Sequence, residues 1–360
     1  MKDTLVSIAD GFRASRGLTE ELSPARMAEL AAEKAGFPNG TEWTQSNITN
    51  IEAIKVVYGN GLWVAGTAAG LYYSADGKEW AQSNIIAEKF YTVCNANGLW
   101  LAGTYNKGFY YSTDGMTWTK NDTFSKSFNV ISNSNGLWIA GNALKSIGLY
   151  YSTDGMTWMP SNLAAGRFLD ICNANGLWLA SCEKYLSDDP VENGVYYSTD
   201  GITWTLSELD AGNGIIEKLY NSNGLWIAVP DDSRGLFYST DGMTWGRSNY
   251  STRAFGSVQN ANGIWVATGA DFNGHGLYYS TDGKSWRASN VTEGNFYSLH
   301  NANGLWVAAG ANGFYYSVDG KTWTLSNNNY GKLTNLSNAN GIWVAAGATG
   351  FYYSVTWQPT

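Results

Sequence analysis

The sequence predicts an all-β fold, an eight-bladed β-propeller of four-stranded antiparallel blades, from three observations. An Asn-Gly-Leu/Ile-Trp element occurs eight times, at a spacing of about 40 residues. Each copy continues into an aromatic-aromatic-Ser strand, and most copies then run into Asp-Gly-x-x-Trp. A repeat of this length with several short strands and tight turns is typical of β-propellers. The two tryptophan sets are Trp63, Trp100, Trp138, Trp178, Trp226, Trp265, Trp306 and Trp343, and Trp43, Trp80, Trp118, Trp158, Trp204, Trp245, Trp286 and Trp323.

Each unit is predicted to hold four strands, named a to d from the axis outward. Short apolar or aromatic runs between turn residues indicate strands. Asn97-Gly98 and Asp114-Gly115 are predicted to be type I′ turns, because both central residues of such a turn need φ > 0. In the second unit the predicted strands are 90–95, 99–103, 108–112 and 117–119.

The two ends of the repeat array complement each other. Residues 39–47 read as a lone strand d, whereas the last unit reaches 351–355 without its Asp-Gly turn. We therefore expect residues 41–47 to pair beside strand c of the last unit, which removes two exposed sheet edges. This places the propeller at residues 39–360, with Trp357 in neither tryptophan set.

Residues 1–38 do not belong to the repeat. Leu5, Ile8 and Phe12 lie at helical spacing, and Ser23-Pro24 reads as an N-cap followed by a first-turn proline that leads into residues 25–35. Two short amphipathic helices are too small to be a stable domain. We expect this helical segment to attach to the propeller, to another copy of the chain or to a larger assembly, with a loosely ordered appendage as the alternative.

Composition limits the possible partners. The formal net charge is −8 and no basic run occurs, which argues against nucleic acid as a partner. There is no long apolar stretch, so membrane insertion is not expected. There is no secretory signal either, so we expect synthesis in the cytoplasm without a signal peptide. The sequence contains no histidine-rich cluster and no phosphate-binding loop, so neither a metal ion nor a cofactor is predicted. Cys94 and Cys172 fall at equivalent inner-strand positions, where we expect buried, small apolar residues.

Loop lengths vary in only one of the connections. The step from Asp-Gly to the next Asn-Gly is 21 residues, except for 23 between Gly201 and Gly224, whereas the step from Asn-Gly to Asp-Gly ranges from 16 to 25. The variation therefore lies in the b–c connection. In an antiparallel blade the b–c and d–a connections emerge on one face, here named the variable face. The a–b and c–d turns emerge on the other, the uniform face.

The variable face is the predicted binding surface, because a rigid scaffold can present variable loops. Its aromatic, amide and carboxylate side chains suit a sugar or a peptide. The alternative is a set of polar loops that bind nothing. Asp188, Asp189 and Glu192 of the longest loop offer a further alternative, a cation site, but their spacing matches no calcium-loop signature. The predicted ligand-binding residues are Tyr91, Tyr105, Arg167, Asp170, Tyr185, Glu217, Lys218, Arg234, Arg253, Phe272, His275, Tyr297 and Tyr330.

Two segments resemble known families. Residues 112–118, Ser-Thr-Asp-Gly-Met-Thr-Trp, resemble the Asp-box hairpin of sialidase-like propellers, with one residue fewer between Asp and Gly. That resemblance implies a structural turn away from any active site. Residues 8–17 and 22–30 look like a helical segment of tail and surface proteins from phages and prophages of Gram-positive gut bacteria. This second resemblance implies a recognition protein on a virion or another extracellular surface.

An enzymatic role is the alternative hypothesis. A sialidase-like mechanism requires an arginine cluster, a Tyr-Glu pair and an acid/base Asp, and no Arg-Ile-Pro-type element occurs here. Asp170 and Glu217 begin adjacent inner strands, and two carboxylates are the minimum for glycoside hydrolysis. The leading prediction remains a non-enzymatic module that binds a cell-surface glycan or protein. A glycan hydrolase and a purely structural tail component are the alternatives.

Overall fold

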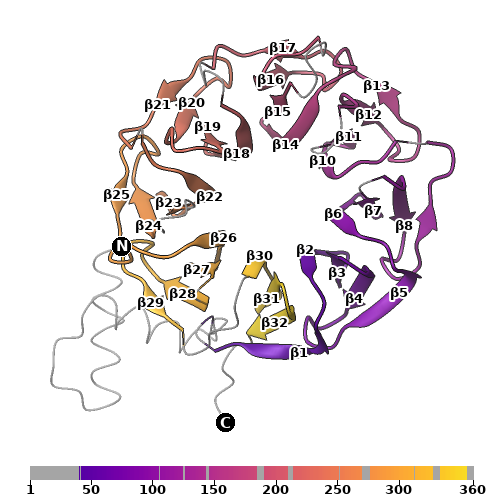
Figure 1. The fold of residues 1–360 in the computed structure, drawn as a ribbon, viewed down its shortest axis with the longest axis horizontal. Coiled ribbons are helices and arrows are strands. Elements are labelled where there is room, and N and C mark those ends of the chain that lie inside the picture. Colours follow the sequence, from indigo (N-terminus) through magenta and orange to yellow (C-terminus); the bar gives the residue numbers. More distant parts are fainter. Residues whose placement is uncertain are drawn as a thin grey trace.

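The computed structural model describes residues 40, 42–104, 106–124, 126–142, 146–184, 190–209, 214–250, 252–269, 276–311, 313–326 and 333–354. These residues form eight separate four-stranded antiparallel sheets, arranged as blades around a central channel (Figure 1). The predicted all-β, eight-bladed fold is confirmed. The predicted N-terminal helices and Trp357 lie outside the described residues. Within the described part, no helix is long and apolar enough to span a membrane.

Blades are numbered 1 to 8 in the order of their inner strands, and strands a and b form the inner half of each blade. Strand a lies next to the channel in every blade (Figure 1). The a strands are β2 (Ala53–Gly59), β6 (Phe90–Ala96), β10 (Val130–Ser134), β14 (Arg167–Ala174), β18 (Ile216–Ser222), β22 (Phe255–Ala261), β26 (Phe296–Ala302) and β30 (Leu333–Ala339). The b strands are β3 (Leu62–Thr67), β7 (Leu99–Thr104), β11 (Leu137–Gly141), β15 (Leu177–Glu183), β19 (Leu225–Pro230), β23 (Ile264–Gly269), β27 (Leu305–Gly310) and β31 (Ile342–Gly347).

Strands c and d form the outer half. In blade 2, strand d begins at Thr119 rather than at the predicted Thr117. The c strands are β4 (Gly70–Ser74), β8 (Phe109–Ser112), β12 (Tyr150–Ser152), β16 (Gly194–Ser198), β20 (Phe237–Ser239), β24 (Leu277–Ser280), β28 (Gly313–Ser317) and β32 (Gly350–Ser354). The d strands are β5 (Ala81–Ile86), β9 (Thr119–Lys120), β13 (Met159–Pro160), β17 (Thr205–Leu206), β21 (Gly246–Arg247), β25 (Arg287–Ala288), β29 (Thr324–Leu325) and, in blade 8, β1 (Thr44–Thr49).

The start of the chain completes the last blade. β1 runs antiparallel to β32, with Thr44 opposite Tyr353, so the predicted non-covalent closure is confirmed. Trp43 anchors this strand, because its indole N–H donates to the carbonyl oxygen of Gly40 at 2.9 Å and its ring stacks on Phe314 with centroids 3.7 Å apart. Closure of the ring therefore combines a sheet edge with a buried aromatic contact.

The a–b turns have the predicted type I′ geometry. Asn97 and Gly98 have φ values of 52° and 81°, and the asparagines of all eight a–b turns have φ between 50° and 53°. Asparagine tolerates this left-handed region better than most residues with a side chain, and glycine adopts it freely. The turn dipeptide therefore sets the hairpin register in each blade.

The c–d connections are not type I′ turns, and that prediction is wrong. Gly115 has φ 74°, but Asp114 is not among the residues with positive φ. The hydroxyl oxygen of Ser112 accepts the N–H of Gly115 at 2.8 Å, while Asp114 Oδ1 accepts the N–H groups of Met116 and Thr117 at 2.8 and 2.7 Å. Side chains thus take up the backbone donors, and the connection opens into a loop over residues 113–118.

The hydrophobic core lies between blades rather than within them. In one cluster, Ile139 and Leu149 of blade 3 pack against Phe168, Ile171 and Trp178 of blade 4. Each further cluster likewise draws on two neighbouring blades, and one of them joins blade 8 to blade 1. Every blade therefore buries apolar surface on both faces, which supplies the main stabilisation of the ring.

Asparagine side chains also hold the outer rim together. Asn84, at the end of strand d in blade 1, accepts the backbone N–H of Trp118 in blade 2 at 2.8 Å and donates to its carbonyl oxygen at 2.9 Å. We name this pair of bonds the Asn–Trp clasp. Asp122 and Glu208 stand at the corresponding position in blades 2 and 4. The other clasps are Asn47–Trp80, Asn162–Trp204, Asn249–Trp286 and Asn290–Trp323.

We predict that Asn84→Ala lowers the free energy of unfolding by about 1–2 kcal/mol, because two hydrogen bonds to a neighbouring blade are lost. Chemical denaturation followed by tryptophan fluorescence measures the change. Asp122→Ala, at the matched position without a clasp, should change stability by no more than about 0.5 kcal/mol. Equal effects of the two substitutions would show that the clasp contributes nothing.

Acid should weaken the c–d connections. Partial burial of Asp154 works against its charge, but the N–H groups of Thr157 and Met156 and the hydroxyl of Ser152 lower its pKa to about 2. Asp282 likewise has a pKa of about 2. Because these folded-state values lie below the ordinary one, the stabilisation is present above about pH 4 and is lost as the pH falls towards 2. Unfolding measured against pH should show this loss, and Asp154→Asn should make it smaller.

Candidate functional site

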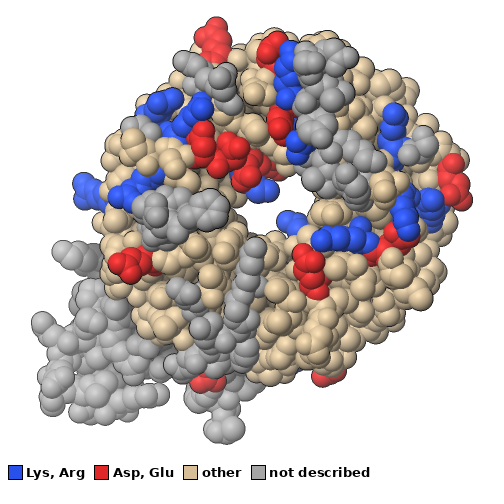
Figure 2. All heavy atoms as spheres, in the orientation of Figure 1, with Lys and Arg blue, Asp and Glu red and all other residues tan. Residues whose placement is uncertain are grey.

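The channel has two chemically different ends. Each inner strand begins near the variable face and ends at its Asn-Gly turn on the uniform face. The N–H of Gly235 in a b–c connection donates to the carbonyl oxygen of Arg253 in a d–a connection at 2.9 Å, so these connections meet on the variable face as expected. Figure 2 shows the channel as an opening through the disc, with acidic and basic side chains gathered around its mouth.

Three predicted site residues occupy β-bulges at the start of inner strands. The register skips one residue at Tyr91 in β6, at Glu217 in β18 and at Tyr297 in β26. A bulge leaves one residue unpaired and changes the direction of its side chain. Glu217 is exposed and Tyr297 is 38% exposed, whereas Tyr91 is half-buried with the Lys89 ammonium 5.3 Å from its ring centroid. The bulges thus present these side chains near the channel mouth.

The side chain of the residue after a bulge can accept a backbone N–H of the inner strand in the next blade. Asp170 Oδ2 accepts the backbone N–H of Leu219 in blade 5 at 2.8 Å, and its Oδ1 accepts the N–H of Ile171 at 3.0 Å. Ser298 and Asn335 make the corresponding contact with blades 8 and 1, at 3.1 and 3.0 Å. Asp170 therefore satisfies a backbone donor on an edge strand, which is a structural role.

Lysines replace these acceptors in blades 1 and 5. Lys55 and Lys218 form no ion pair with any described residue. Desolvation works against the charge of Lys218, but Asp170, Tyr220 and Glu217 outweigh it and raise the pKa of Lys218. Desolvation, and then Lys218, lower the pKa of Lys55. The two cations thus act on one another within the channel.

The predicted arginines have local roles. Arg167 Nη1 lies 2.9 Å from Glu183 Oε2 within blade 4, and Arg234 Nε lies 2.7 Å from Asp232 Oδ2 within one connection. Arg253 is half-buried. These contacts fix the arginines on the variable face in separate blades. Five other predicted residues lie outside the described part and stay predictions, namely Tyr105, Tyr185, Phe272, His275 and Tyr330.

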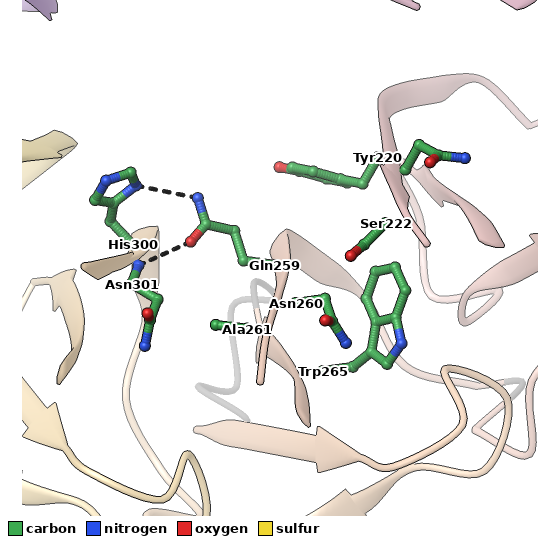
Figure 3. Close-up of a pocket in the computed structure, with 9 residues that line it drawn as sticks. Tyr220, Ser222, Gln259, Asn260, Ala261, Trp265, His300 and Asn301 are labelled. Atoms are coloured by element: carbon green, nitrogen blue, oxygen red, sulfur yellow. Dashed lines mark hydrogen bonds between the residues drawn. The ribbon is translucent and has the colours of Figure 1, made fainter. Parts of the chain in front are cut away.

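A cavity that the sequence analysis did not predict lies at the opposite end of the inner strands. It has a volume of about 330 Å³ and lies between blades 5, 6 and 7 (Figure 3). We name it the blade 5–7 pocket. Its lining residues are Tyr220, Asn221, Ser222, Gln259, Asn260, Ala261, Trp265, His300 and Asn301.

One strand position distinguishes this pocket from the rest of the channel. It is the residue before the one that pairs with the first tryptophan, and across the eight blades it is Val57, Cys94, Ser132, Cys172, Tyr220, Gln259, His300 and Ser337. Only three consecutive blades carry large polar side chains there. This change of chemistry at constant spacing is the signal from which the pocket could have been found.

Hydrogen bonds fix the tautomer of His300. Gln259 Oε1 accepts the backbone N–H of Asn301 at 2.9 Å, which turns its amide nitrogen towards His300 Nδ1, 3.1 Å away (Figure 3). Nδ1 must therefore accept, and the ring proton lies on Nε2. Burial, and then the charge of Lys55, lower the pKa of His300. The imidazole is thus held neutral, with its Nε2–H available as a donor.

The cysteines have no catalytic features. Cys94 and Cys172 are half-buried, and burial raises the pKa of these thiols to about 11 and about 12. Thiols with such values carry little nucleophilic thiolate at neutral pH. Cys182 is buried within blade 4. Among the residues that the structure describes, no group of three or more His, Cys, Asp or Glu side chains could hold a metal ion.

Comparisons with known proteins support the fold. No protein-family model matches the sequence, and no curated protein matches it. Among solved structures, the chain is similar to Sqt1 of Saccharomyces cerevisiae, with a TM-score of 0.63 at 10% identity over 89% of this chain and 100% of that one. It is also similar to BamB from Moraxella catarrhalis, with a TM-score of 0.60 at 12% identity over 88% and 98%.

A third similar structure is YCF48 bound to D1 peptide, with a TM-score of 0.55 at 15% identity over 89% of this chain and 100% of that one. The fold is therefore shared with proteins of dissimilar sequence. At these identities the likeness extends to the fold alone, and function has to be argued from the site.

His300 should titrate below the ordinary histidine range. We predict that its imidazole stays neutral at pH 6.5, and that Lys55→Gln raises its pKa because one opposing charge is removed. Gln259→Glu should raise it further, since a carboxylate would accept a hydrogen bond from Nδ1–H of the protonated imidazole and stabilise its charge. Titration by NMR of the imidazole signals measures these shifts, with His300→Gln to assign them. An unchanged pKa in both variants would contradict the geometry described above.

Proposed function

We propose that this chain is a non-enzymatic recognition propeller that binds a protein surface through its variable face. The observation that carries the proposal is the restriction of loop-length variation to the b–c connections, while the a–b turns keep one geometry in all eight blades. A scaffold that repeats one face and diversifies the other is suited to presenting a binding surface.

The described side chains favour a protein over a glycan at this face. Its charged groups form pairs around a broad rim, including Lys107 with Glu88 at 2.9 Å and Lys89 with Glu52 at 3.3 Å. Charged, complementary surfaces of this kind direct protein association. Sugar binding relies on exposed aromatic faces, and of the two predicted aromatic residues that the structure describes, Tyr91 is half-buried beneath Lys89, which leaves Tyr297 as one exposed ring. That YCF48 has been solved bound to a peptide adds support from a protein of similar fold.

The proposed setting is a phage-tail-like particle or another extracellular surface, with residues 1–38 as the attachment segment. The resemblance of residues 8–17 and 22–30 to phage and prophage proteins supports it. The Ser112 and Asp114 hydrogen bonds support the likeness of the c–d connection to the Asp-box hairpin, in which the aspartate serves the fold. Under this proposal the geometry that repeats in every blade maintains the scaffold, and the variable face binds the partner.

A glycan hydrolase that uses Asp170 and Glu217 is less well supported. Both carboxylate oxygens of Asp170 accept backbone N–H groups, which commits the side chain to the fold.

Binding to whole cells tests the proposed function. Fluorescently labelled protein should bind Gram-positive gut bacteria, and protease treatment of the cells should abolish the binding because the partner is a protein. Tyr297→Ala combined with Glu217→Lys should weaken binding about tenfold or more, as expected for loss of a contact centre. Met116→Ala, on the uniform face, is the matched control, since Met116 is 40% exposed and Tyr297 38%.

Other results would favour the alternatives. Loss of binding after periodate treatment of the cells but not after protease treatment would show that the binding partner is a glycan rather than a protein. Release of reducing sugar that disappears in Asp170→Asn would establish the hydrolase. If the protein neither binds cells nor releases sugar, but is stably incorporated into a particle, the result would favour a purely structural component.

A further inference from the structure

The walls of the blade 5–7 pocket combine one aromatic face with several polar groups. Figure 3 shows the Tyr220 ring extending along one side of the pocket, with the side chains of Gln259 and His300 opposite. The hydroxyl of Tyr220 lies 3.4 Å from Ser257 Oγ at the channel side of the pocket. Trp265 is buried and Tyr220 is half-buried, so Tyr220 supplies the more accessible ring face.

Hydrogen-bonding capacity remains unfilled around this cavity. His300 Nε2–H and one N–H of the Gln259 amide have no acceptor among the described residues. The amide nitrogens of Asn221 and Asn301 are buried without a hydrogen-bond partner, but so are those of Asn133, Asn173 and Asn338 at the same strand position of blades 3, 4 and 8, so these belong to the repeat. The donors peculiar to this cavity are those of Gln259 and His300, and they suit a ligand that carries acceptor atoms.

Charge near the cavity selects against cations. No carboxylate lines the pocket. Lys218 lies two residues before Tyr220 in the regularly paired part of β18, so the two side chains project from the same face of that strand, and Lys55 occupies the same position in β2. Neither is neutralised by an ion pair with a described residue. Asp170, which favours the charged form of both lysines, also accepts the N–H groups of Ile171 and Leu219.

We propose that the blade 5–7 pocket binds a single sugar ring that carries a carboxylate. Ring hydroxyls both donate and accept, as the amide side chains and Ser222 do, and the C–H face of a sugar packs on an aromatic ring such as Tyr220. The carboxylate is directed towards Lys55 and Lys218. A cavity of about 330 Å³ accommodates one such ring rather than an extended chain. The pocket lies towards the uniform face, and apart from Lys218 its argument uses no residue of the variable face and does not depend on the function proposed for that face.

The test compares three probes, D-glucuronate, D-glucose and acetate. Titration of the full-length protein, followed by the NMR signals of the His300 imidazole and by calorimetry, should show glucuronate binding at least about tenfold more tightly than glucose, a factor that one favourable charge interaction supplies. Acetate should bind more weakly than glucuronate, because it lacks the ring. The preference for glucuronate should fall as the salt concentration rises.

Substitutions separate the two parts of the site. Tyr220→Ala should weaken binding of glucuronate and of glucose by about tenfold or more, because the ring contact is lost. Tyr220→Phe keeps the ring and should retain most of the affinity, which guards against a folding defect in the alanine variant. Lys55→Gln with Lys218→Gln should abolish the preference for glucuronate while glucose binding remains. Ser132→Ala, at the matched strand position of blade 3, should change neither.

Three results would overturn the proposal. Glucose and glucuronate could bind equally, which removes the carboxylate from the recognised chemistry. Acetate could compete as well as glucuronate, which would identify an adventitious carboxylate only. Absence of any shift of the His300 signals at saturating glucuronate, in protein whose thermal unfolding is normal, would show that the pocket does not bind the sugar.

Discussion

Neighbouring blades belong to separate sheets, so side chains satisfy many of the backbone groups at the blade interfaces, beside direct backbone bonds such as that from the Glu208 N–H to the Met243 carbonyl oxygen. At the outer rim, Asn84 and its counterparts accept the N–H and donate to the carbonyl oxygen of a tryptophan in the next blade. At the channel, Asp170, Ser298 and Asn335 cap N–H groups of the following inner strand. Apolar packing supplies most of the energy of association, whereas these polar contacts fix how the blades are aligned.

This constraint determines which positions are available for binding. A residue that caps a neighbouring blade cannot change freely, since its loss leaves an edge-strand donor without a partner. The exceptions are therefore informative. Lys55 and Lys218 stand where an acceptor stands in other blades, and Tyr220, Gln259 and His300 replace small side chains one position before the tryptophan pair. At the first position a hydrogen-bond acceptor that joins two blades is replaced by a cation. At the second position a small residue is replaced by a large side chain that can donate or accept hydrogen bonds.

The sequence was sufficient for the blade number, the closure by β1 and the a–b turns, because each depends on local patterns repeated eight times. It was insufficient for the c–d loops, where the dipeptide rule favoured type I′ but Ser112, two residues before Asp114, competes for the backbone donors. The pocket was missed for a different reason. Tyr220, Gln259 and His300 lie about one repeat apart in the chain, and only the packing of inner strands brings them together. The N-terminal helices and five loop residues lie outside the described part.

The order of residues along β18 links the two ends of the channel. Glu217 lies in the bulge near the variable face, Lys218 follows it, and Tyr220 comes two residues later, towards the uniform face. A ligand that enters from the variable face therefore passes an exposed carboxylate, then the two lysines, and reaches the neutral donors of the pocket last. Lys55 and Lys218 attract an anion before it reaches the pocket. Selection by charge thus precedes selection by hydrogen bonding, for which the pocket offers the neutral groups of Tyr220, Gln259 and His300.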